Sequence, residues 1–227
     1  MTDTVRVEIW SDVVCPWCYI GKRRFERALA ELDGEIEVEV VYRPYQLDPT
    51  APVGTATPVS EVYAKKFGGP ERAQQIFEHV TRIATDEGLD FQLDRALRAN
   101  TRDAHRLLWF AEQQGGPVVQ GAVKERLLQA YFTEGLDVGD REVLADTAAE
   151  AGLERAGVAA FLDGVDGTDE VDHDLQTAHE RGITAVPTYV IDDAWAVPGA
   201  QEPHTFVQVI RRMVAKRDER AAEGPGD

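Results

Sequence analysis

The sequence of 227 residues is poor in cysteine and in basic residues, and each shortage excludes a class of protein. Two cysteines cannot form the disulfide framework of a small secreted domain, and a chain of this length buries enough apolar surface to fold without one. Lysine and arginine number 24 against 41 aspartates and glutamates, which gives a net charge of −17. Because such a surface repels phosphate groups and anionic lipids, we expect no nucleic-acid partner and no membrane partner.

The sequence also lacks a long apolar run. No stretch approaches the ~20 apolar residues that span a membrane. The polar start, residues 1–4, has neither the basic residues nor the apolar segment of a signal peptide. We therefore expect a soluble, cytoplasmic protein, in which thiols are mostly reduced.

What the sequence does contain is strand patterning near its N-terminus, arranged around a helical pattern. Apolar residues alternate with polar ones over 5–9 and again over 36–42, which predicts two strands. Between them, apolar residues recur at helical spacing from Phe25 to Leu32 and stop before Gly34. The opening therefore predicts a strand-helix-strand unit.

Strand patterns return near the C-terminus, at 188–191 and 194–197, before a last amphipathic helix from about Pro203. The signals between 59 and 182 are nearly all helical. We predict an α/β fold in which one discontinuous domain, 1–50 with 183–222, is interrupted by an all-helical insertion. The insertion covers 51–182, and a polar tail covers 223–227.

Both cysteines lie at the predicted junction between the first strand and the first helix. Unpaired N–H groups and the helix dipole favour a thiolate at Cys15, and Pro16 fits the first helical turn. Cys18 lies one turn deeper and faces Cys15. A Cys-x-x-Cys at such a junction is typical of redox motifs. We expect Cys15 to be the nucleophile and Cys18 the thiol that resolves the mixed disulfide.

The cysteine pair has two other possible interpretations. A structural zinc site needs four ligands, and no histidine pair with ligand spacing accompanies the cysteines, so we expect no metal. Free cysteines are also often inert members of a hydrophobic core. The junction position makes a redox pair the favoured interpretation.

The segment 11–21, with its Cys-Pro-Trp-Cys motif, resembles the thioredoxin-fold proteins related to DsbA, specifically the FrnE-like branch. That branch is related to 2-hydroxychromene-2-carboxylate isomerases and kappa-class glutathione transferases. Three further stretches carry the resemblance, in the expected order: 43–49, 100–107, and Val186-Pro187-Thr188 followed by Gly199-Ala200-Gln201.

The resemblance implies a thioredoxin-like fold with a large helical insertion, and a cis bond between Val186 and Pro187 beside Cys15. It implies a cytoplasmic thiol–disulfide oxidoreductase that exchanges with protein or small-thiol substrates. The redox-active disulfide would need no cofactor beyond a low-molecular-weight thiol. The resemblance also implies that the protein could act in polyketide biosynthesis. The alternative is a thiol-dependent isomerase or transferase acting on small aromatic compounds. The sequence carries no signal for oligomeric state.

The predicted site extends beyond the two cysteines. We expect the substrate to contact the residues of the motif and of the proline loop, namely Pro16, Trp17, Val186 and Pro187. Three more residues are candidates for the cleft: Asp12, Asn100 and His105. Asp12 also suits a turn, and His105 also suits a hydrogen-bonded helix residue.

Overall fold

Within residues 4–54 and 57–223, which the computed structural model describes, four strands form a mixed sheet in the order β2-β1-β5-β6. The strands are β1 (Val5–Ser11), β2 (Val38–Pro44), β5 (Thr188–Ile191) and β6 (Trp195–Pro198). β1 and β2 are parallel and joined by α1 (Pro16–Leu32), as a parallel pair requires. β5 pairs antiparallel with β1, and β6 with β5, so both ends of the chain share one sheet.

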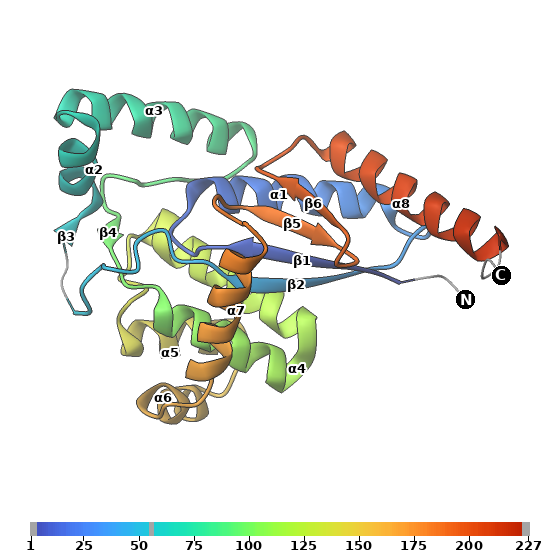
Figure 1. The fold of residues 1–227 in the computed structure, drawn as a ribbon. Helices are drawn as coiled ribbons and strands as arrows, with labels where there is room; N and C mark the ends of the chain where they lie inside the picture. The colour runs from blue at the N-terminus through green and yellow to red at the C-terminus, as the bar shows by residue number, and fades with distance from the viewer. Residues whose placement is uncertain (1–3, 55–56, 224–227) are drawn as a thin grey trace.

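One face of the sheet is covered by α1 and by α8 (Pro203–Glu223), as Figure 1 shows. The alternation in β1 turns Val5, Val7 and Ile9 to this face, where they are buried. The rings of Phe25 and Phe206, from the two helices, lie with centroids 5.0 Å apart. The period-two pattern of β1 and the helical spacing of apolar residues in α1 predict this layer.

The opposite face is covered by α4 (Arg102–Gln129) and α7 (Thr168–Glu180), both of which pack against β2 (Figure 1). Trp10, on the alternate side of β1, is buried there against Ala178 and Ile183. The sheet therefore lies between two helical layers, and this arrangement is the predicted thioredoxin-like α/β fold.

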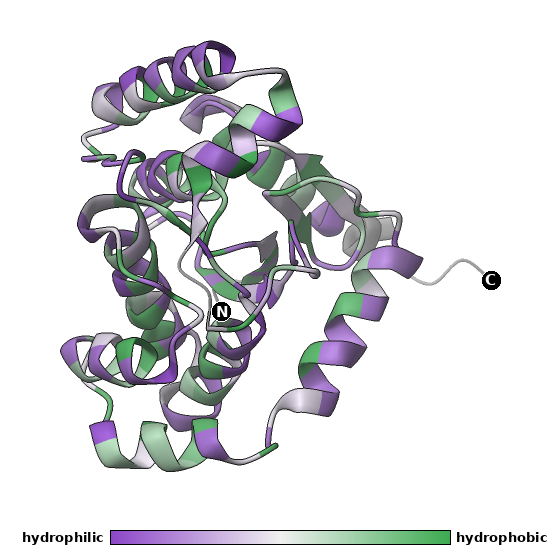
Figure 2. Cartoon of the chain, turned by 90° about the vertical axis from the view of Figure 1, so that its left-hand side faces the viewer, coloured by the Kyte–Doolittle hydropathy of each residue, from purple (hydrophilic) through white to green (hydrophobic). Residues whose placement is uncertain are grey.

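The segment between β2 and β5 contains helices, the loops that join them and one short antiparallel ladder, β3 (Thr57–Pro58) with β4 (Leu97–Arg98). Besides α4 and α7 it contains α2 (Val59–Phe67), α3 (Pro70–Asp86), a π-helical turn η1 (Ala130–Glu134), α5 (Arg141–Glu150) and α6 (Arg155–Asp163). Figure 2 shows hydrophobic and hydrophilic residues alternating along these helices, as expected when one side faces the core.

The sequence predicts that a helix ends at Gly115-Gly116-Pro117 and that another helical segment follows. The helical conformation is interrupted at Gly115 and Gly116, so α4 consists of two helical halves that meet at a kink. Gly116 has a φ of 68°, a conformation that favours glycine, so the chain bends there. Pro117 then begins the second half of α4, where its missing N–H costs little.

The largest hydrophobic cluster joins the insertion to the start of α1. It is built from buried residues of α3 to α6 but also includes Val13, Tyr19 and Ile20, which flank the cysteines. The insertion therefore packs directly on the predicted site. The boundaries 1–50, 51–182 and 183–222 stay a prediction, and all but Glu223 of the predicted tail lies outside the described residues. Every helix in the described ranges is too short or too polar to cross a bilayer.

Candidate active site

The turn between β1 and α1 places the two cysteines at the start of a helix. Cys15 is the N-cap residue of α1, and Pro16 occupies its first position, as predicted. The Cys15 N–H donates to the Asp12 carbonyl at 3.3 Å, and the Cys18 N–H donates to the Cys15 carbonyl at 3.0 Å. The Cys15 side chain makes no capping hydrogen bond, and the positive end of the α1 dipole lies at the cysteine pair.

Both cysteines are free thiols and nearly buried, Cys15 being 4% and Cys18 3% exposed. Trp17, between them, is 37% exposed. The motif thus combines one accessible aromatic side chain with two shielded sulfur atoms.

The loop before β5 lies against the motif. The Val186–Pro187 bond is cis, as the resemblance implies, and the Cys15 thiol donates to the Val186 carbonyl with Sγ and O 3.7 Å apart. Gly21 of α1 permits this approach, because a Cβ atom there would lie 3.0 Å from Cγ of Pro187. Residues 171 positions apart in the sequence therefore meet at the Cys15 sulfur.

The surroundings of Cys18 shift the pKa of its thiol in opposite directions. Burial raises the pKa of its thiol well above the ordinary value, and the hydrogen bond and charge of Cys15 act in the same direction. The charge of Lys124 and a hydrogen bond from the Asp12 backbone oppose this effect. Cys18 is therefore held as a neutral thiol while the two cysteines are reduced.

Lys124, in α4, is a residue of this site that the sequence analysis missed. It is 1% exposed, and burial lowers the pKa of its ammonium group to about 8, against the charges of Cys18, Asp12 and Cys15. A signal was present, because Gln120, Lys124 and Leu128 follow one another at four-residue spacing. All three are buried, so the row of side chains that holds Lys124 faces the interior.

Asp12 and His105 lie together beneath the motif. His105 Nε2 is 3.4 Å from Asp12 Oδ1 and 3.0 Å from the carbonyl of Tyr45, and the other oxygen of Asp12 accepts the N–H of Leu47 at 2.8 Å. Asp12 also closes the turn to Cys15. The pair therefore fixes the segment 45–47 against the start of α1.

Asn100 contributes to another part of the molecule. Its amide donates to the Ala51 carbonyl at 2.8 Å, and its side-chain oxygen accepts the N–H of Arg102 at 3.0 Å. It thus starts α4 and lines a cavity of ≈ 520 Å³ with Arg102 and Arg141. None of these contacts involves a cysteine.

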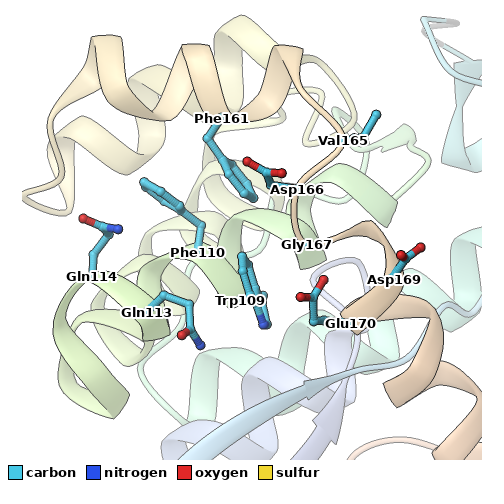
Figure 3. A pocket seen from close by; sticks show the side chains of 10 residues that line it. All are labelled: Trp109, Phe110, Gln113, Gln114, Phe161, Val165, Asp166, Gly167, Asp169 and Glu170. Carbon is cyan, nitrogen blue, oxygen red and sulfur yellow. The ribbon is translucent and has the colours of Figure 1, made fainter.

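A cleft lies on the insertion, between α4 and the loop that joins α6 to α7 (Figure 3). Its volume is ≈ 440 Å³, and Trp109, Phe110 and Phe161 form its aromatic wall. Neither this cleft, nor the cavity at Asn100, nor a third of ≈ 10 Å³ is lined by Cys15 or Cys18. Among the described residues, no cluster of three or more histidine, cysteine or acidic side chains could hold a metal ion.

A thioredoxin-like sheet that presents Cys-x-x-Cys at the start of its first helix, beside a cis-proline loop, defines a class of redox protein. The chain belongs to the DSBA-like thioredoxin domain family, whose family model matches residues 6–211. The chain is therefore a DsbA-like thioredoxin-fold protein, as its motifs predict.

One relative and two solved structures illustrate what the chain is similar to. It is 30% identical to the uncharacterized protein YwbO of Bacillus subtilis, over 91% of this chain and 96% of that one. The crystal structure of a probable DsbA oxidoreductase of Streptomyces coelicolor, SCO1869, has a TM-score of 0.82 at 38% identity, covering 92% and 89% of the two chains. A 2-hydroxychromene-2-carboxylate isomerase shares the fold, with a TM-score of 0.64 at 15% identity over 94% and 98%.

Proposed function

We propose that this protein is a thiol–disulfide oxidoreductase whose Cys15–Cys18 pair exchanges between dithiol and disulfide with protein or small-thiol substrates. The observation that carries the proposal is the position of the pair. Cys15 begins α1 with its sulfur beside the Val186 carbonyl, and Cys18 is buried one turn further along the helix. A helix N-terminus favours a thiolate, which is the attacking species in disulfide exchange.

The reaction has two exchange steps. The Cys15 thiolate attacks a substrate disulfide, whose S–S bond breaks to give a Cys15–substrate mixed disulfide and one substrate thiolate, which takes a proton from solvent. Cys18 then loses its proton and attacks the Cys15 sulfur, releasing the second substrate thiolate. The substrate disulfide is reduced, and the protein dithiol is oxidised. In reverse, the protein disulfide oxidises two substrate thiols.

The residues around the pair suit substrate capture. Trp17 is exposed beside Cys15 and offers an aromatic surface, while Pro16 and Pro187 frame the sulfur from the helix and the loop. As the resemblance implies, an extended substrate segment would bond to the backbone of the loop at Val186, in the manner of an added strand. A low-molecular-weight thiol such as glutathione would return the pair to its starting state without a further cofactor.

Insulin reduction by dithiothreitol tests the proposal. The wild-type protein should accelerate the precipitation of insulin, and Cys15→Ser should abolish the acceleration. Cys18→Ser should still attack but not resolve, so a covalent mixed disulfide should accumulate and be visible by mass spectrometry. Acceleration that survives Cys15→Ser would contradict the proposal.

The isomerase or transferase activity that the resemblance leaves open would need an enclosed pocket for a small aromatic compound beside Cys15. Neither Cys15 nor Cys18 lines any of the three cavities described above, and the position of the cysteine pair at the start of α1 supports disulfide exchange. Incubation with a small aromatic acid and glutathione, followed by identification of the products, separates the two activities, because only the isomerase or transferase would convert the aromatic compound. The FrnE-like branch, the cytoplasmic setting and the link to polyketide biosynthesis stay predictions from the sequence.

A further inference from the structure

Lys124 is a buried lysine without a hydrogen-bond partner. Its side chain is 1% exposed, and its Nζ atom donates to no group in the described part of the chain. A buried ammonium group without a partner costs stability, so a purely structural position would favour an apolar residue here. Its presence needs another explanation.

Three contacts of α4 fix where Lys124 points. One turn earlier, Gln120 bonds to the backbone of Tyr42, with its oxygen 2.7 Å from the amide nitrogen and its nitrogen 3.0 Å from the carbonyl oxygen. Lys124 Nζ lies 5.6 Å from the centre of the Tyr42 ring. The next residue, Glu125, bonds to the hydroxyl of Tyr19, which directly follows Cys18. Lys124 is therefore held between β2 and the first turn of α1.

The groups that face Lys124 are mainly those of the cysteine site. Cys18, Cys15 and Asp12 interact electrostatically with its charge and favour the ammonium form, whereas Lys22 of α1 opposes it. Burial is the largest effect and brings its pKa to about 8, so both protonation states are accessible near neutral pH. The buried Tyr189 of β5 also interacts electrostatically with Cys18, although burial is the main cause of its raised pKa.

The second step of disulfide exchange requires the buried Cys18 thiol to ionise, and a nearby lysine can assist this ionisation. In the mixed disulfide, Cys18 must become a thiolate before it can attack the Cys15 sulfur. Burial opposes that ionisation strongly, as its raised pKa indicates. A thiolate formed there needs a positive charge nearby and a group that can take its proton.

We propose that Lys124 is the proton acceptor of the second exchange step, taking the Cys18 proton on its Nζ atom and stabilising the thiolate that forms. This inference rests on the proposed function. The Cys18 thiol and the Lys124 amine become a thiolate and an ammonium ion. The thiolate then forms the bond to the Cys15 sulfur, and the bond to the substrate sulfur breaks. The departing substrate thiolate takes a proton from the ammonium ion or from water, so charge and protons balance.

Stopped-flow reaction of the reduced protein with excess 5,5′-dithiobis(2-nitrobenzoate) separates the two steps. Each protein should release one coloured thiolate when Cys15 attacks and a second when Cys18 resolves the mixed disulfide. At pH 7, Lys124→Met should slow the second release at least tenfold and the first less than threefold. The rate of the second release should level off between pH 8 and 9 in the wild type but keep rising in the variant.

Lys124→Gln provides a second variant of similar length, and circular dichroism checks that both are folded. Lys216→Met, which removes the same charge from α8, should leave both phases unchanged. A wild-type rate and pH profile of the second release in folded Lys124→Met or Lys124→Gln would overturn this inference alone. Absence of the first release in the wild type would instead overturn the proposed function.

Discussion

At the scale of single residues, Gly21 decides how closely the cis-proline loop approaches α1. A Cβ atom at this position would lie 2.6 Å from the Tyr189 hydroxyl, 3.0 Å from Cγ of Pro187 and 3.2 Å from Cβ of Ala200. The Tyr189 side chain is buried and cannot move into solvent. The loop carrying the Val186 carbonyl must therefore shift if any side chain is added.

We predict that Gly21→Ala lowers the free energy of unfolding by about 1–3 kcal/mol, the usual cost of overpacking a core. It should also slow insulin reduction, since the loop beside Cys15 moves. Urea unfolding and the insulin assay measure the two effects. Gly121→Ala, in α4, is the matched control. No neighbouring atom lies within 4 Å of its added Cβ, so we expect the free energy of unfolding to rise by about 0.5–1 kcal/mol. Equal stability of the two variants would show that the close approach of the loop to Gly21 does not affect the free energy of unfolding.

At the scale of elements, Glu125 holds α4 against α1. Its carboxylate accepts from the Tyr19 hydroxyl at 2.8 Å, from Lys22 at 2.5 Å and from Arg23 at 2.7 Å. Burial alone would raise the pKa of Glu125, but Lys22 and Arg23 outweigh burial and hold it below its ordinary value. Because Lys22 is buried, this ion pair is shielded from solvent and salt.

The lowered pKa of Glu125 predicts a pH dependence of stability. Its pairs contribute fully above the pKa of the unfolded state, near pH 4.5, and are lost as the pH falls through the lower folded value. Glu125→Gln should therefore lower the free energy of unfolding by about 1–3 kcal/mol at pH 6 and by less at pH 3. Urea unfolding at both pH values measures this difference. Glu170→Gln, an exposed control, should change stability by less than about 0.5 kcal/mol. An equal loss from Glu125→Gln at both pH values would contradict the sign of this shift.

The elements also show which parts of the site a sequence can supply. Cys15, Cys18 and Pro16 are predictable because a period-two strand followed by a proline at a helix start fixes their positions locally. The proximity of Lys124 depends on how α4 crosses β2, which the Gln120 bonds to Tyr42 set across 78 positions. No local pattern encodes that crossing.

The kink in α4 illustrates the same limit. Glycine and proline at 115–117 indicate an interruption, and Gly116 does leave the helical conformation. Whether the chain ends a helix there or bends and continues depends on the packing of its two halves. His105 and Gln120, from opposite sides of the kink, both bond to the segment 42–45, so β2 and the loop after it hold the halves in line.

At the scale of the whole molecule, the sheet and the helical insertion share their contacts. The largest cluster of buried residues contains Val13, Tyr19 and Ile20 beside the core of the insertion. The Gln120 bonds to Tyr42 are buried, and the ion pairs of Glu125 join the same two parts. Neither part can be separated without exposing apolar surface and buried polar groups. The predicted division into two domains is therefore a division of sequence more than of stability.

We predict that the protein unfolds in urea in one transition. Far-UV circular dichroism reports on all the helices, and the fluorescence of Trp10 reports on the sheet once Trp17, Trp109 and Trp195 are replaced by phenylalanine. The two midpoints should coincide, which is the test of two-state behaviour. Gln120→Ala should lower both midpoints together and reduce the free energy of unfolding by about 1–3 kcal/mol, because it leaves buried backbone groups of Tyr42 unpaired. Separate midpoints would mean that the insertion unfolds on its own. In that case Lys124 would leave the cysteine site while the sheet is still folded, and resolution by Cys18 should fail at lower urea concentration than attack by Cys15.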